Sequence, residues 1–149
     1  MEYDKLEFET TFKNGDMIPV EYTGYGKNIS PEFRIKNLSD KAKSLVIILE
    51  DLSHPIKNFT HWIAWNIKAN SVIPENVGNM DNVMQGIAYG FHKYAGAKPP
   101  MFQKHNYKYT IYSLDNTLEL SSNIMKKKLL KAMNGHILQK GTIIGYFKR

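Results

Sequence analysis

The segment that most restricts the fold is an apolar, largely β-branched run at residues 45–49, followed after a polar stretch by a second apolar run at residues 61–67. Short runs of this kind, bounded by turn residues, are typical of buried β-strands. Strand-like segments occur at residues 8–11, 32–34, 44–50, 61–67, 107–114 and 142–147. Asn, Gly and Asp mark turns at residues 14–16, 25–28, 37–40 and 76–79. This alternation predicts a mainly β fold, an antiparallel β-sandwich.

One segment predicts a helix. Apolar residues recur on one helical face between residues 123 and 138, with lysines opposite. We expect Ser121 or Ser122 to cap its N-terminus and Gly141 to follow its end. Residues 82–100 contain three glycines and two prolines without periodicity. This composition indicates a long functional loop.

The size and composition predict one globular unit. A chain of 149 residues with 42% hydrophobic residues has the length of a single domain, expected over residues 1–149. The absence of cysteine excludes disulfides, zinc–thiolate sites and a cysteine nucleophile. No apolar stretch approaches the ~18 to 20 residues that span a bilayer, and the first residues do not resemble a signal peptide. We therefore expect a cytoplasmic protein without a membrane span.

The net charge of +6 favours anionic partners such as phosphate or lipid headgroups. Many of the basic residues lie near the C-terminus, at Lys126, Lys127, Lys128, Lys131, Lys140, Lys148 and Arg149. We interpret them as a solvated helix face and tail. No nucleic-acid motif accompanies them, so no nucleic-acid partner is expected.

Three polar residues stand where loops meet apolar strands. Asp51 ends one strand, His61 begins the next, and His105 precedes the strand at residues 107–114. Functional side chains often occupy such positions because the scaffold beneath them is rigid. Tyr107 lies two residues after His105 and therefore points to the same strand face. These residues are expected to converge on one small polar pocket.

Five blocks of residues in a fixed order carry a resemblance to a known family. They are Gly26 with Asn28, Ile29, Ser30 and Pro31; Asp51 with Pro55; His61 and Trp62 with Asn66 and Ile67; Tyr94 and Gly96 with Pro99 and Pro100; and His105 and Tyr107 with Asp115. In this pattern the chain resembles the phosphatidylethanolamine-binding protein family, whose bacterial and archaeal members are often called Raf kinase inhibitor-like proteins. The resemblance covers about residues 8 to 146.

The resemblance implies a large and a small sheet with peripheral helices, and a small anion-binding pocket. The residues implied at the pocket are Asp51, Pro55, His61, Tyr94, Gly96, His105 and Tyr107. The Asp would accept a hydrogen bond from a histidine, whose N–H groups then face the anion. The bond before Pro55 is implied to be cis, and the amides of the Tyr94–Gly96 loop are implied to line the pocket. The expected ligands carry phosphate: a phospholipid headgroup, a nucleotide or a phosphorylated partner protein.

This sequence departs from the family pattern at several positions. Leu52 and Ser53 replace a Pro and a second Asp, which makes the pocket less acidic. Lys93 and Ala97 stand where the family has Gly and Pro, and Asn106 where many members have Arg. We expect Lys93 to point to solvent.

Other functions remain as alternatives. A metal site would draw on Asp51, His54, His61 and His105, but no dense ligand spacing supports one, so neither metal nor cofactor is expected. A hydrolase using Asp51, His61 and His105, with Ser53 nearby, lacks a Gly-x-Ser-x-Gly motif. We therefore expect a binding protein that is not an enzyme. The remaining alternative is an interaction module that inhibits a protein kinase or protease and has an incidental pocket. A homodimer is also compatible with the resemblance.

Overall fold

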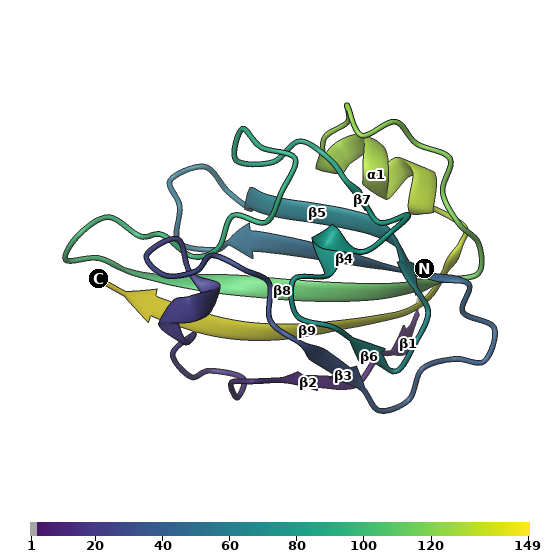
Figure 1. The fold of residues 1–149 in the computed structure, drawn as a ribbon, viewed down its shortest axis with the longest axis horizontal. Coiled ribbons are helices and arrows are strands. Elements are labelled where there is room, and N and C mark those ends of the chain that lie inside the picture. Colours follow the sequence, from purple (N-terminus) through teal and green to yellow (C-terminus); the bar gives the residue numbers. More distant parts are fainter. Residues whose placement is uncertain (1–2) are drawn as a thin grey trace.

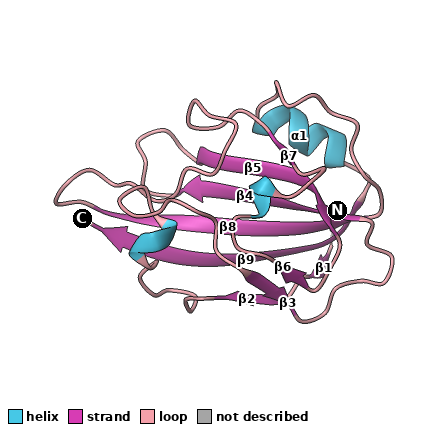
Figure 2. Cartoon of the chain, viewed as in Figure 1, coloured by secondary structure: helices cyan, strands magenta, loops and turns pink. Residues whose placement is uncertain are grey.

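The computed structural model describes residues 3–149 and contains two β-sheets packed face to face (Figures 1 and 2). The larger sheet has the strand order β1-β9-β8-β4-β5-β7, and the smaller one has the order β2-β3-β6. The strands of the larger sheet are β1 (Asp4–Lys5), β4 (Ser44–Asp51), β5 (Phe59–Lys68), β7 (Met84–Gln85), β8 (Lys104–Leu114) and β9 (Ile137–Lys148). Those of the smaller sheet are β2 (Phe8–Thr10), β3 (Phe33–Ile35) and β6 (Val72–Ile73). The predicted β-sandwich is confirmed.

Strand β4 explains where the core lies. All of its residues are buried, because it runs through the middle of the larger sheet. Leu45, Ile47 and Leu49 face the smaller sheet, and the alternate residues Val46 and Ile48 face the other side. There they pack in one apolar cluster with Leu129 and Met133 of the helix α1 (Lys126–Met133). The apolar run at residues 45–49 is therefore continuous because both of its faces are covered.

The helix is shorter than predicted. It ends at Met133, because Gly135 adopts a left-handed conformation (φ 86°) and the chain then turns into β9. Ile137 and Leu138, which matched the helical stripe, are the first residues of that strand. Met125 is the N-cap and no side chain caps the helix, so the prediction of Ser121 or Ser122 is wrong; Gly141 lies inside β9.

Two further differences concern the pairing of one strand and the presence of short 3-10 helices. The short strand β1 pairs with β9 in parallel, while the other neighbours in the larger sheet are antiparallel. Two short 3-10 helices are present, η1 (Val20–Tyr22) and η2 (Val77–Asn79). No helix within residues 3–149 is long and apolar enough to cross a membrane.

The strand order brings distant residues to one end of the sandwich. Because β4 lies between β5 and β8, its last residue Asp51 is paired with Phe59 on one side and Tyr107 on the other. The loops after β4 and before β8 lie at this end, beside the C-terminus at the left of Figure 1.

Candidate functional site

A cavity of about 500 Å³ opens at this end of the sandwich. It is lined by residues from the ends of three strands and the loops beside them: Asp51, His54, Pro55, Phe59, His61, Tyr89, Lys98, Pro100, Gln103 and His105. A larger groove of about 910 Å³ runs along residues 5–14 beside β9, but it contains no histidine. A buried carboxylate and two buried histidines, Asp51, His61 and His105, line the smaller cavity, which is therefore the candidate site.

Asp51 and His105 form a buried pair. Asp51 Oδ2 lies 2.8 Å from His105 Nδ1, and the two side chains are 3% and 8% exposed. The second oxygen of Asp51, Oδ1, accepts a hydrogen bond of 2.8 Å from the Ser53 amide. A carboxylate accepts only, so Nδ1 of His105 carries a proton. Both oxygens of Asp51 are thus occupied by donors from the protein.

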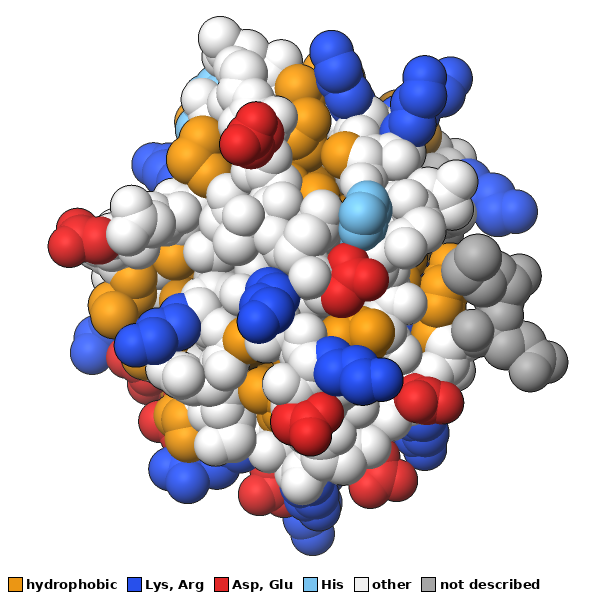
Figure 3. Space-filling view, turned by 90° about the vertical axis from the view of Figure 1, so that its right-hand side faces the viewer, with side chains coloured by type: hydrophobic (Ala, Val, Ile, Leu, Met, Phe, Trp, Pro, Cys, Tyr) orange, Lys and Arg blue, Asp and Glu red, His pale blue; other side chains and the backbone are white. Residues whose placement is uncertain are grey.

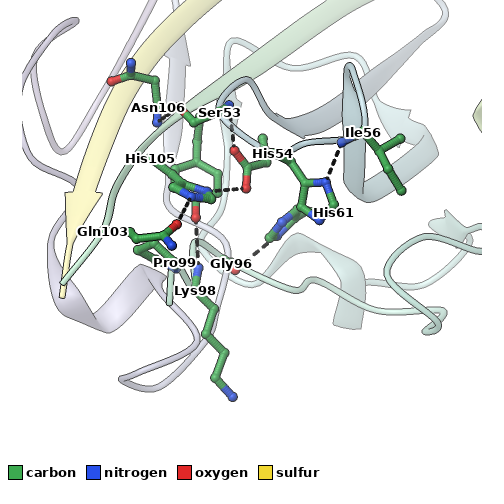
Figure 4. Close-up of polar contacts among 12 residues, drawn as sticks. Ser53, His54, Ile56, His61, Gly96, Lys98, Pro99, Gln103, His105 and Asn106 are labelled. Carbon is green, nitrogen blue, oxygen red and sulfur yellow. Dashed lines mark hydrogen bonds and ion pairs between the residues drawn. The ribbon is translucent and has the colours of Figure 1, made fainter. Parts of the chain in front are cut away.

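The other ring nitrogen of His105 contacts the side chain of Gln103. Nε2 lies 2.9 Å from the side-chain amide of Gln103, which also lines the cavity (Figure 4). A neutral ring accepts a hydrogen bond at Nε2 from the N–H of the Gln103 side-chain amide, whereas an imidazolium donates a hydrogen bond to the amide oxygen. Gln103 can therefore accompany either protonation state by rotating its amide.

His61 is held differently. Its Nδ1 lies 3.0 Å from the Ala95 carbonyl oxygen and 3.2 Å from that of Gly96. Carbonyls accept only, so Nδ1 carries the proton and Nε2 of the neutral ring is an acceptor. Burial lowers the pKa of His61 below its ordinary value of 6.5, although the two carbonyls and Asp51 act in the opposite direction. The ring is therefore neutral at pH 7.

Tyr107 lies beneath the two histidines. Its ring centroid is 5.5 Å from that of His61 and 6.3 Å from that of His105, and the side chain is fully buried. The hydroxyl accepts a hydrogen bond of 3.2 Å from the Lys98 amide. Burial, with a smaller effect of the Asp51 charge, raises the pKa of Tyr107 far above its usual range. The hydroxyl therefore stays protonated. Tyr107 contacts the two histidines but is not among the residues that line the cavity.

His54 is a cavity residue that the sequence did not single out as a ligand-binding group. Its Nδ1 accepts a hydrogen bond of 3.0 Å from the Ile56 amide, so the neutral ring carries its proton on Nε2. The ring stacks on Phe59 with a centroid distance of 3.9 Å. His54 therefore presents a neutral N–H donor at the cavity. In the sequence, the one indication that His54 could bind a ligand was its position directly before Pro55.

The loop that contains Tyr94 and Gly96 differs from the expectation. Tyr94 is buried outside the cavity, because its hydroxyl donates to the Tyr22 carbonyl (2.7 Å) and pairs with the Tyr109 hydroxyl (2.6 Å). The amide of Gly96 donates to Asn28 Oδ1 (2.7 Å) and so is not free for an anion. The loop turns its carbonyls toward His61. A side chain at Gly96 would collide with the Tyr22 carbonyl, which accounts for glycine there.

Pro55 lines the cavity, but the bond before it is trans, in contrast to the implied cis bond. Lys93 is exposed, and its ammonium lies 5.1 Å from the centre of the Phe91 ring. The stem of Lys98 borders the cavity, while its ammonium lies over the ring of Tyr25 at 5.8 Å. Lys98 is thus the one lysine among the residues that line the cavity.

The geometry supports neither a hydrolase nor a metal site. Ser53 Oγ accepts a hydrogen bond of 2.9 Å from the Asn106 amide, which holds it away from a nucleophile's position beside a histidine. Among residues 3–149, no group of three or more His, Cys, Asp or Glu side chains is arranged to hold a metal.

Comparison with known proteins places this arrangement in a family. A sequence model of the phosphatidylethanolamine-binding protein family matches residues 8–148. A UPF0098 protein of Pyrococcus horikoshii is 41% identical over 152 residues, which cover 97% of this chain and 77% of that protein.

Solved structures agree. The crystal structure of a phosphatidylethanolamine-binding protein homologue from Chlamydia trachomatis has a TM-score of 0.85 and 30% identity, covering 98% of this chain and 99% of that one. The fold of Escherichia coli YbcL is similar as well, with a TM-score of 0.86, 20% identity and coverage of 97% and 99%. The chain belongs to the phosphatidylethanolamine-binding protein family.

Proposed function

We propose that the cavity binds a phosphate-bearing ligand: a phospholipid headgroup, a nucleotide or a phosphorylated residue of a partner. The observation that carries this proposal is the pairing of Asp51 with His105. A free carboxylate in the cavity would repel an anion. Here Asp51 receives hydrogen bonds from His105 and Ser53, so both of its oxygens are directed at protein donors before a ligand arrives.

The groups left to the ligand are mainly donors. His54 offers Nε2–H, and a protonated His105 offers a second donor at Nε2 once the Gln103 amide turns away from it. Phosphate oxygens accept such hydrogen bonds, which are stronger when a partner is charged. The cationic side chain of Lys98 at the mouth adds long-range attraction.

His61 restricts the form of the ligand. Because Nε2 of its neutral ring accepts, it suits a ligand that brings a donor of its own. A singly protonated phosphate, a hydroxyl and an ammonium group each supply one. We therefore expect phosphoethanolamine and inorganic phosphate to bind better than dimethyl phosphate, which has no donor.

The proposal is one of binding and not of catalysis. Ser53 Oγ accepts a hydrogen bond from the backbone of Asn106, and the residues that line the cavity include no serine, threonine or cysteine. Inhibition of a protein kinase or protease stays the main alternative, with the cavity incidental to it. Exposed apolar side chains around the mouth favour an interface with a larger partner.

Calorimetric titration tests the proposal. Wild-type protein is titrated with phosphoethanolamine, inorganic phosphate, dimethyl phosphate and a nucleoside monophosphate. The matched control is His136→Ala, because His136 also contacts an Asp (Nδ1 to Asp115 Oδ1, 2.9 Å) but lies on the surface outside the cavity. His54→Ala should weaken phosphoethanolamine binding while His136→Ala binds as wild type. Equal binding by both variants would refute the assignment.

A further inference from the structure

Exposed apolar side chains surround the mouth of the cavity. Three segments carry them: residues 52–58, 86–93 and 98–103. The most exposed are Phe102 (87%), Met101 (62%) and Ile56 (62%), and Leu52, Tyr89 and Phe91 are also exposed. Scattered apolar residues on a surface need no explanation, but a cluster around a binding cavity marks an interaction site. We call this cluster the apolar rim.

Two features make the apolar rim a built structure. Aromatic rings connect the apolar rim to the cavity. The ring centroid of Tyr89 lies 5.8 Å from that of Phe59, which lines the cavity, and 6.3 Å from that of Phe91. Tyr89 and Phe102 also have positive φ angles, 54° and 70°. That conformation is unfavourable for bulky side chains and tends to persist at functional sites.

The charge around the apolar rim has one sign. Segments 52–58 and 86–104 contain Lys57, Lys93, Lys98 and Lys104 but no Asp or Glu. Arg149 joins them, because its carbonyl accepts a hydrogen bond of 2.9 Å from the Phe102 amide. The opposite end of the molecule, which faces the viewer in Figure 3, mixes acidic and basic side chains. Charge is therefore distributed unevenly along the molecule.

We propose that the apolar rim docks on an anionic phospholipid bilayer. Phe102, Met101 and Ile56 enter the interfacial layer, the lysines contact anionic headgroups, and the cavity faces the headgroup that it binds. This inference rests on the proposed function, since it makes a lipid the source of the phosphate. Peripheral membrane proteins combine apolar insertion with basic residues, because each contribution alone gives weak attachment.

The shape of the apolar rim favours a bilayer over a protein partner. The apolar side chains stand on three separate loops around an opening, and Phe102 is almost fully exposed. A fluid interfacial layer accommodates such projections without a matching pocket. A protein would need both a pocket for Phe102 and an acidic surface for the lysines.

Vesicle binding tests the inference. Full-length protein is sedimented with vesicles of phosphatidylcholine, with and without phosphatidylserine. We expect binding to the mixed vesicles that weakens with salt. Replacing Met101 and Phe102 together with Ser should weaken it by roughly tenfold or more. The control replaces Met80 and Met125 with Ser; both are exposed outside the apolar rim, and this variant should bind as wild type.

A second readout reports insertion directly. The tryptophans Trp62 and Trp65 are buried, so Phe102→Trp adds an exposed fluorophore. Its emission should shift to the blue on adding phosphatidylserine vesicles. No shift, or equal vesicle binding by wild type and the Met101/Phe102 variant, would overturn the inference.

Soluble phosphoethanolamine separates the two proposals. If it binds to the cavity while vesicles do not, docking fails, the proposed function stands, and the apolar rim is assigned to a protein partner. If vesicles bind through the apolar rim while soluble ligands do not bind, docking stands and the phosphate assignment of the cavity fails.

Discussion

Asp51 and His105 are separated by 54 positions in the sequence, yet their side chains are joined by a hydrogen bond of 2.8 Å. The strand order accounts for this, because the end of β4 lies beside the start of β8. The pair supplies a hydrogen-bond donor to the one carboxylate that lines the cavity and fixes a proton of His105 on Nδ1.

Removing His105 should lower stability without unfolding the protein. His105→Ala leaves the buried Asp51 carboxylate with Ser53 as its one protein donor, which we expect to cost about 1 to 3 kcal/mol. A domain of this kind has ~5 to 15 kcal/mol of stability, so the variant remains folded. Urea unfolding measures the loss. The surface variant His136→Ala should change stability by less than about 1 kcal/mol; a similar loss in both variants would contradict the buried pair.

Stability should fall as the pH drops below 6.5, in part through His61. Burial lowers the pKa of this ring in the folded protein, so the unfolded chain binds the proton more readily. Between the folded pKa and 6.5, stability therefore rises with pH, and above 6.5 the contribution is constant. His61→Asn retains a donor for the Ala95 carbonyl but does not titrate. Its unfolding free energy should depend less on pH between 5 and 7, and an unchanged slope would refute the role of His61.

Trp62 should be a stability residue. It is buried, its indole N–H donates to Gln85 Oε1 (2.7 Å), and its ring meets Tyr94 edge to face at 5.1 Å. We expect Trp62→Ala to cost ~3 to 5 kcal/mol in urea unfolding. A loss below about 1 kcal/mol would mean that the inter-sheet core does not depend on this side chain.

An ion pair between Lys126 and Glu50 should help to hold helix α1 against the larger sheet. Lys126 Nζ lies 2.6 Å from Glu50 Oε2, whereas Lys108 Nζ is 3.7 Å from the other oxygen. Lys126→Met should cost about 1 to 3 kcal/mol, because the largely buried carboxylate loses its nearest partner. Lys128→Met, on the exposed side of the helix, serves as the control. Adding Glu50→Gln should recover part of the loss; if the two changes are additive, the pair contributes nothing.

Strand positions in the site were predictable, and loop geometry was not. Asp51, His61 and His105 were predicted to converge because each lies at an end of an apolar run, and such ends meet when short strands pair. The family pattern supported the same prediction. Tyr94 was assigned to the cavity because it stands in the family's loop, but its direction depends on Tyr22 and Tyr109, which are distant in sequence. The donor on His54 depends on one loop amide, which spacing does not reveal.

The same distinction applies to the fold. The long strands were found because five or more residues carry a pattern, whereas β1, β6 and β7 have two residues each. The helix was extended too far because Ile137 and Leu138 fit both a helical stripe and a strand. The turn at Gly135 decided between them.

The most direct measurement is calorimetric titration of phosphoethanolamine into wild type, His105→Ala and His136→Ala at pH 6 and pH 8. We predict saturable binding to wild type and His136→Ala that is tighter at pH 6, because the singly protonated phosphate, which brings a donor to Nε2 of His61, is favoured there. His105→Ala should bind at least about tenfold more weakly, which corresponds to ~1.4 kcal/mol. Binding by His105→Ala equal to that of wild type, or no binding by any of the three proteins, would contradict the account.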